Sequence, residues 1–368
     1  MNVRRKIDVW LLELLSVNKM MFNSISTSKT SFFYLSLFLT LLISCGDEKL
    51  AEIEPIKIKR FDLDLLKFDT AQFEKSEEKM LLQHGDVYTF YIEKLMGLGS
   101  IDPNNSYYYK PHMNRFLNGE YAAMMDTMNR LVIGDVEKFE KEITQSYRRL
   151  CTHFPDKKPS VVYSFFISPM GSNPAAAFSY GQDTVGINWF NYLGKDFSLY
   201  RSLYEGYSYM VEWNQPAYLS RNVMLVEYNL LHEKYKTKDE YSELIYNMIE
   251  KGKEFYFLDK VCPDMKDHTK IGYTAEQNKW CQENEFEIWA YFKENKLLYS
   301  IETMDIKRMT EEGPTTPGMP SESPGMVGAW LGWQIVKAYQ AKEKKSLKEL
   351  IQTSPKEIMK AANYKPKK

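Results

Sequence analysis

This sequence of 368 residues has few cysteines and histidines, and it carries no marked excess of positive or negative charge. It contains four Cys and five His, and no two cysteines have the Cys-x-x-Cys spacing of zinc and redox sites. Lys and Arg number 48 against 49 Asp and Glu, a formal net charge of -1, so the basic surface of a nucleic-acid-binding protein is not expected. Neither phosphate-binding glycine motif, G-x-x-x-x-G-K-[ST] or G-x-G-x-x-G, occurs. The sequence therefore predicts that the protein binds no nucleotide, and it indicates no other cofactor.

Long apolar segments are also few, and a mean hydropathy of -0.46 excludes a polytopic membrane protein. Aromatic residues, in contrast, are abundant: they make up 14% of the chain, and hydrophobic residues as a whole 44%. This composition is typical of a folded globular protein. The rings either fill a large core, which we favour, or line a groove for a peptide or a glycan.

The one long apolar run lies near the N-terminus, at residues 31–43. Thirteen uncharged residues form a helix of about 20 Å, which is too short for a bilayer core of about 30 Å. Lys29 precedes the run, and Ser44 and Cys45 follow it. A basic residue, a short apolar core and a small residue before the cleavage point are typical of a secretory signal peptide.

The sequence Leu42-Ile43-Ser44-Cys45 matches a bacterial lipobox, in which the cysteine thiol is acylated. We therefore predict a signal peptide at 1–44, with Met20 and Met21 as alternative starts, and lipidation of Cys45. Residues 45–55 would be an acidic tether between the lipid and the folded domain. No Asp follows Cys45 directly, which favours the outer membrane of the cell envelope.

The rest of the chain, 56–368, is predicted to be a single α+β domain. It should be mostly helical with a small central sheet, mixed or antiparallel, because β-prone runs are confined to the first half. The expected elements are a strand at 56–61, helices at 70–95, 121–131 and 136–153, a loop at 97–111 that holds Tyr107–Tyr109, strands at 160–168 and 176–189, helices beyond residue 196 and a loop at 313–325.

Capping boxes, in which a Ser or Thr and a Glu or Gln satisfy free backbone N–H groups, mark two helix starts. They are Thr237–Glu240 and Thr274–Gln277. The second should open one helix that continues through Trp289. In the last long helix, the small residues Gly328 and Gly332 predict a closely packed neighbour.

His232-Glu233-Lys-Tyr-Lys236 is the nearest approach to a catalytic motif. Zinc peptidases use His-Glu-x-x-His on a helix, so that two imidazoles face one metal ion and the Glu acts as base. Lys236 occupies the second ligand position, so we predict no metal site and no enzyme. His232 and Glu233 are kept as residues of a candidate remnant site.

Glu285 shares a predicted helix face with Cys281, Ile288 and Trp289. A carboxylate among apolar residues has a perturbed pKa and can be functional. More often, such a carboxylate holds the core together through a hydrogen bond. We favour the structural role and keep Glu285 as a candidate pocket residue.

Pieces spread over residues 40–368 resemble the gliding-motility lipoprotein B (GldB) family. Besides the lipobox, they are Lys59–Asp62, Gly181–Asp183, Val185–Asn188, Tyr192–Gly194, Gly252-Lys253, Ile271–Thr274, Gln277, Trp280, Asn284-Glu285, Ile288-Trp289, Leu298–Ser300, Ser323–Gly325, Gly328, Gly332–Val336, Tyr339 and Tyr364–Pro366. Met326 stands where the family pattern has Arg.

The resemblance implies a lipoprotein of the gliding and type IX secretion machinery, with those components and the membrane as partners. It also implies a body distantly similar to gluzincin metallopeptidases, but without the zinc motif and without established catalytic residues. The first hypothesis is therefore a non-catalytic binding or assembly protein. The alternatives are a divergent zinc-peptidase-like envelope hydrolase and a lipoprotein that binds peptides or glycans.

Overall fold

The computed structural model places residues 50–368 in one compact unit. Its described residues are 49–101, 106–132, 136–167, 175–205, 208–237 and 242–366. The predicted signal peptide and Cys45 lie outside them. Within these ranges, no helix combines the length and the apolarity needed to cross a membrane.

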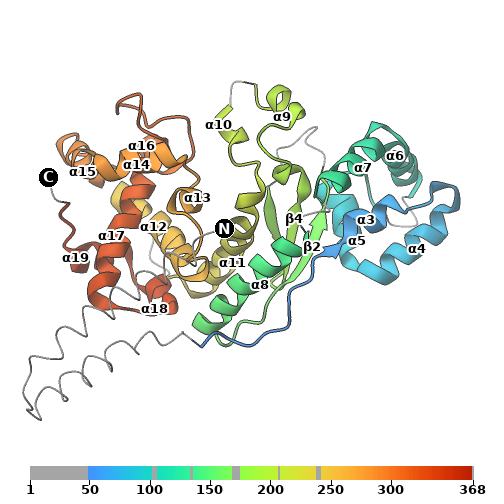
Figure 1. The fold of residues 1–368 in the computed structure, drawn as a ribbon, viewed down its shortest axis with the longest axis horizontal. Coiled ribbons are helices and arrows are strands. Elements are labelled where there is room, and N and C mark those ends of the chain that lie inside the picture. Colours follow the sequence, from blue (N-terminus) through green and yellow to red (C-terminus); the bar gives the residue numbers. More distant parts are fainter. Residues whose placement is uncertain are drawn as a thin grey trace, which may run out of the picture. The chain divides into compact units, whose positions relative to one another are not determined.

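A four-stranded mixed sheet lies in the middle of the chain (Figure 1). Its order is β1 (Lys59–Arg60), β2 (Val161–Phe165), β4 (Thr184–Asn188), β3 (Ala177–Tyr180). The first three strands are parallel, and β3 pairs antiparallel with β4. The small sheet, predicted to be mixed or antiparallel, is confirmed and is mixed; the strands within 160–168 and 176–189 are also confirmed. The predicted strand at 56–61 is too long, because the chain turns into a helix at Phe61.

One face of the sheet is covered by the N-terminal helices. These are α3 (Phe61–Leu66), η1 (Thr70–Gln72), α4 (Phe73–His84), α5 (Asp86–Phe90), η2 (Tyr91–Leu95) and α6 (Ser106–Asn118). The next helix, α7 (Glu120–Val132), instead contributes Met125 and Met128 to the core on the opposite face. Because side chains alternate along a strand, Tyr163 and Phe165 of β2 face an aromatic cluster with Phe61 and Tyr91. Val162 and Phe166 belong to the core on the opposite face.

The loop predicted at 97–111 is wrong in its second half, because α6 begins at Ser106 and contains Pro111. Tyr109 is fully buried, and its hydroxyl is hydrogen-bonded to that of Tyr88. Burial of this helix face thus outweighs the local cost of the proline. The side chains of Tyr107 and Tyr108 lie outside the described residues.

The second face and the C-terminal half are helical, as predicted. The elements are α8 (Val136–His153), η4 (Trp189–Tyr192), α9 (Ser198–Leu203), α10 (Ser208–Val211), η5 (Pro216–Tyr218), α11 (Leu219–Tyr235), α12 (Leu244–Val261), α13 (Asp267–Ile271), α14 (Ala275–Glu283), α15 (Glu285–Glu294), η6 (Leu297–Tyr299), α16 (Thr303–Thr310), α17 (Val327–Glu343), α18 (Leu347–Gln352) and α19 (Pro355–Ala362). The aromatic residues largely fill the core, including Trp189, Trp330 and Trp333.

Of the two predicted helix starts, one is confirmed. Thr274 and Gln277 form the capping box of α14. The predicted box at Thr237 extends over residues 238–240, which lie outside the described residues, and α12 begins only after Glu243. The helix predicted to run on to Trp289 is divided at Asn284, whose backbone leaves the helical region.

Glycines allow α12 and α17 to pack backbone to backbone. A Cβ atom on Gly332 would lie 1.7 Å from the carbonyl oxygen of Met248, and one on Gly252 would lie 2.4 Å from the Gly332 carbonyl carbon. Gly328 approaches the Met309 carbonyl in the same way. The close neighbour predicted from Gly328 and Gly332 is therefore confirmed.

Candidate functional site

His232 and Glu233, at the end of α11, have different partners. His232 Nε2 lies 3.2 Å from an oxygen of Glu250 on α12, and its ring stacks on Tyr228. Glu233 is exposed and accepts a hydrogen bond from Lys236 at 2.6 Å. Among the described residues, no group of three or more His, Cys, Asp or Glu side chains is placed to hold a metal ion.

Glu285 begins α15 and accepts a hydrogen bond from the hydroxyl of Tyr364. Burial is the main cause that raises the pKa of Tyr364, and the Glu285 carboxylate raises it further. Trp289 packs edge-on against the same tyrosine, with ring centroids 5.4 Å apart. The described contacts of Glu285 thus fasten the C-terminal segment to α15, and none joins it to His232 or Glu233.

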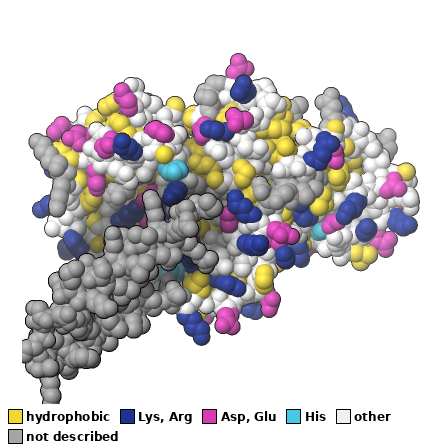
Figure 2. All heavy atoms as spheres, in the orientation of Figure 1, with side chains coloured by type: hydrophobic (Ala, Val, Ile, Leu, Met, Phe, Trp, Pro, Cys, Tyr) yellow, Lys and Arg dark blue, Asp and Glu magenta, His cyan; other side chains and the backbone are white. Residues whose placement is uncertain are grey.

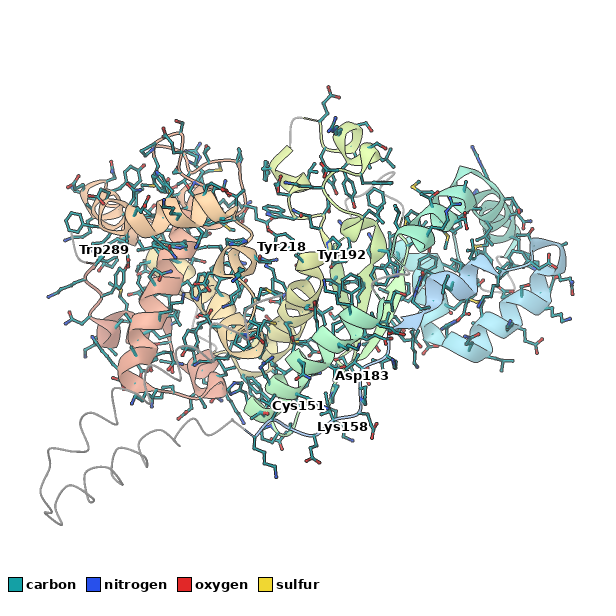
Figure 3. The ribbon with its side chains drawn as sticks, in the orientation of Figure 1. Cys151, Lys158, Asp183, Tyr192, Tyr218 and Trp289 are labelled. Atoms are coloured by element: carbon teal, nitrogen blue, oxygen red, sulfur yellow. The ribbon has the colours of Figure 1, made fainter. Side chains whose placement is uncertain are left out.

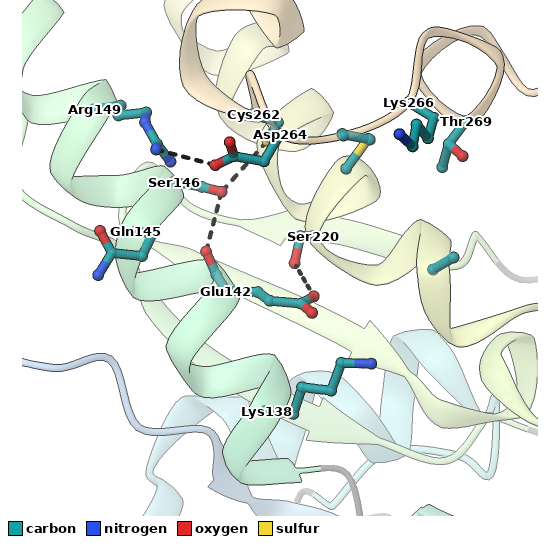
Figure 4. Close-up of a pocket in the computed structure, with 12 residues that line it drawn as sticks. Lys138, Glu142, Gln145, Ser146, Arg149, Ser220, Cys262, Asp264, Lys266 and Thr269 are labelled. Atoms are coloured by element: carbon teal, nitrogen blue, oxygen red, sulfur yellow. Dashed lines mark hydrogen bonds and ion pairs between the residues drawn. The ribbon is translucent and has the colours of Figure 1, made fainter. Parts of the chain in front are cut away.

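A first pocket, of about 410 Å³, lies between α8, the start of α11 and the segment after α12 (Figure 4). The Cys262 thiol is near-fully buried there and contacts Ser146 Oγ at 3.4 Å. Burial raises its pKa to about 11. Arg149 pairs with Asp264 at 3.2 Å across the rim. With the thiol protonated and these charges matched, the pocket offers little reactivity.

A second hollow, called here the α11 hollow, has a largely polar lining and a volume of about 370 Å³. It lies between α11, the start of β3 and the segment that carries α10. Its lining residues are Ala175, Ala176, Ala177, Asn191, Tyr204, Met210, Trp213, Asn214, Arg221, Asn222, Leu225, Val226, Asn229 and Glu312. In Figure 3, Tyr192 and Tyr218 mark the helices beside it.

A smaller hollow of about 140 Å³, called the loop hollow, shares Trp213 and Glu312 with the α11 hollow. Gly272–Thr274, Gln277 and Gly325-Met326 complete its wall. Several pieces of the family resemblance therefore meet here, although they are distant in sequence. Because the two hollows share Trp213 and Glu312, they adjoin each other, and together they make up the candidate site.

Buried amides build the floor of the α11 hollow. Asn188 at the end of β4 donates to Asn191 at 2.8 Å, and Asn191 donates to Asn214 at 3.2 Å. Asn188 also accepts from the backbone N–H of Ile167. This chain of amides connects Ile167, just after β2, to the residues that follow β4, because a buried amide without partners is costly.

Arg221 and Glu312 supply the charge of the site. Arg221 donates through Nε to the Lys270 carbonyl at 2.7 Å and through one Nη to Asn222 at 2.9 Å. Burial lowers the pKa of Arg221, although the nearby Glu312 opposes this. Neither side chain has an ion-pair partner within 4.0 Å among the described residues, so both charges can interact with a ligand.

The loop at 313–325 contains no helix, as predicted, and hydrogen bonds hold it against the site. The Tyr273 hydroxyl donates to the Gly325 carbonyl at 2.7 Å, and Thr316 Oγ1 donates to the Pro324 carbonyl at 2.7 Å. Met326 follows with a φ of 47°, in the left-handed region, and is 6% exposed. The residue that departs from the family pattern therefore lies in the wall of the loop hollow.

Sequence reasoning did not find the charged and aromatic residues of this site. Trp213, Arg221 and Glu312 come from three separate segments without a common spacing. The available signal was the pair of short pieces Gly272–Thr274 and Ser323–Gly325, which the fold brings to the same hollow. On the face shown in Figure 2, basic and acidic side chains are interspersed rather than separated by sign.

Comparisons with known proteins identify one family. The family model for the gliding motility protein GldB matches residues 46–366. Neither a curated protein nor a solved structure matches the chain significantly.

Proposed function

Because the chain belongs to the gliding motility protein GldB family, we propose that it is an outer-membrane lipoprotein that supports gliding motility and the associated type IX secretion machinery. It would act by binding rather than by catalysis. The observation that carries the proposal is the family match, which extends over nearly all of the chain after Cys45.

The proposed anchor is a lipid on Cys45, directly before the matched residues. A single acyl chain binds a membrane only weakly and reversibly, whereas several chains on one residue anchor a protein stably. Gly46 rather than Asp follows the cysteine, which favours the outer membrane. The short acidic tether would then hold the folded domain close to the membrane surface.

The proposed binding role is supported by the partners of the former catalytic candidates. Glu233 is engaged by Lys236, His232 by Glu250 and Glu285 by Tyr364. In contrast, Arg221 and Glu312 remain available in a polar hollow. A body distantly similar to gluzincin metallopeptidases also stays a proposal, and an experimental structure of the chain would test it.

Complementation of a strain that lacks the gene tests the role. We expect the wild-type chain and the His232→Ala and Glu233→Ala variants to restore colony spreading and secretion of type IX cargo. Cys45→Ala should mislocalise the protein and restore neither. Full restoration by Cys45→Ala would contradict the anchored role, and loss of function in His232→Ala at normal protein levels would favour an enzyme.

The rival candidate is a divergent zinc hydrolase, for which the His232-Glu233 pair is the motivation. The purified chain should then hold one zinc ion per molecule and cleave peptides, and His232→Ala should abolish both. We expect neither zinc binding in that ratio nor cleavage.

A further inference from the structure

The outer edge of the sheet offers unpaired backbone groups. Among the described residues, β4 is the only strand that pairs with β3, although α11 packs close to it. The Asn188 N–H donates to the Ala176 carbonyl at 3.0 Å, and this bond identifies which opposite residues of β3 and β4 form hydrogen-bonded pairs. Because hydrogen-bonded and non-hydrogen-bonded pairs alternate, Ala177 and Ser179 direct their N–H and C=O groups away from β4. Such an edge can pair with another extended chain.

The α11 hollow begins at this edge. Ala175, Ala176 and Ala177 form part of its wall. The Tyr192 hydroxyl donates to the Ala176 carbonyl at 3.1 Å and accepts from Asn222 Nδ2 at 3.1 Å. Since Asn222 in turn accepts from Arg221, three hydrogen bonds connect the strand to the guanidinium.

The charges of the hollow define what an added chain must carry. Arg221 stacks over Tyr218, at 5.8 Å from the ring centroid, and has no carboxylate partner among the described residues. A guanidinium binds a carboxylate through paired N–H groups, which gives both affinity and orientation. Glu312 lies in the same hollow, so it would disfavour a second carboxylate there and could accept a hydrogen bond from a donor on the ligand.

We propose that this edge and the α11 hollow bind an extended peptide segment of another protein, which adds a strand to β3 and presents a carboxylate to Arg221. The inference rests on the proposed binding function and names the class of its partner. A peptide is favoured over a glycan because a row of outward N–H and C=O groups is complemented by another backbone, as in other strand-addition complexes. The carboxylate is either an acidic side chain or the C-terminus of the segment.

Two variants separate the contributions of backbone and charge. Ala177→Pro removes one outward N–H but leaves the ladder to β4, and proline is tolerated at a strand edge in this position. Arg221→Gln removes the guanidinium. Arg149→Gln is the matched control, because it removes an arginine whose partner, Asp264, is exposed at a different pocket.

The full chain in detergent is screened against a random ten-residue peptide library with free C-termini. We expect selected peptides whose affinity falls at least tenfold in both Ala177→Pro and Arg221→Gln and is unchanged in Arg149→Gln. N-methylation of alternate peptide amides should also weaken binding at least tenfold. Amidation of the peptide C-terminus distinguishes a terminal carboxylate from a side-chain carboxylate.

Hydrogen exchange locates the bound peptide. The Ala177 and Ser179 amides should become protected, whereas the Phe178 amide, already bonded to β4, should change little. The proposal is overturned if no peptide is enriched over a control without the protein, or if the two variants bind the peptides as tightly as wild type does. It is also overturned if the amides that become protected lie away from β3. Protection of the edge by a second copy of this chain, or of the hollow by a soluble glycan alone, would also overturn it.

Melting curves check that Ala177→Pro is folded; if it is not, the Arg221→Gln and N-methylation results decide. Failure of this inference is separable from failure of the proposed function. Loss of spreading on gene deletion without any peptide binding leaves the function and removes the peptide site. Peptide binding at β3 without a deletion phenotype would leave the peptide site and remove the proposed function.

Discussion

At the scale of single residues, two buried charges outside the candidate site are paired. Lys253, 1% exposed, donates to Glu250 at 2.8 Å and to the Thr353 carbonyl at 2.8 Å. Glu227, fully buried on α11, accepts from the Tyr147 hydroxyl at 2.7 Å and lies 3.0 Å from Lys157 Nζ. Removing one member of such a set leaves an uncompensated charge in the interior.

Lys157→Met should therefore lower the free energy of unfolding by about 3 kcal/mol. Adding Glu227→Gln should recover part of this loss, because the stranded carboxylate is then neutral. Lys158→Met is the control, since Lys158 (labelled in Figure 3) is exposed and its loss should have little effect. Urea unfolding measures all three; equal stability of the two single variants would contradict the assignment.

His84 introduces a pH dependence. It is 7% exposed, and burial lowers its pKa more than the nearby Asp64 raises it. The folded state thus binds protons less readily than the unfolded state, so stability is full above the unfolded pKa of about 6.5 and is lost as pH falls below it. Between pH 7.5 and 5.5, wild type should lose more stability than His84→Gln. Exposed His112→Gln should follow wild type; a parallel decline in all three would exclude His84 as the cause.

At the scale of elements, local sequence patterns correctly predicted the helices and strands whose conformation is determined by their own residues. The alternating strands around the Gly181–Asp183 turn, the helix at 136–153 and the Thr274 capping box are of this kind. The helix through Pro111 could not be predicted, because burial of Tyr109 overrides a local breaker.

Like that helix, the candidate site could not be predicted from local sequence patterns. Its charged groups meet only after α11 packs beside β3 and the loop before α17 folds back. No spacing within any one segment connects Arg221 to Glu312. The short family pieces indicated the region, but not the residues that give it charge.

The contact of α12 with α17 gives a prediction for whole elements. Gly332→Ala places a methyl group against the Met248 backbone, so the helices must separate, and we expect a loss of about 3 kcal/mol in unfolding free energy. Gly313→Ala is the matched control, because its nearest contact, at 3.6 Å, is ordinary. Thermal melting compares them, and an unchanged melting temperature in Gly332→Ala would show that the close approach does not exist.

At the scale of the whole molecule, the proposed lipid on Cys45 would anchor a folded domain that has a polar, charged hollow beside the β3 edge of its sheet. The domain supplies a rigid surface, since the amides under the hollow are hydrogen-bonded and the loop before α17 is held by Tyr273 and Thr316. Such a surface is suited to holding a partner at the membrane.

The most direct test of the central claim is a clean in-frame deletion of the gene, scored for colony spreading and for secretion of type IX cargo. The account predicts loss of both, restored by the wild-type chain but not by Cys45→Ala. Normal spreading and normal secretion in the deletion strain would contradict it.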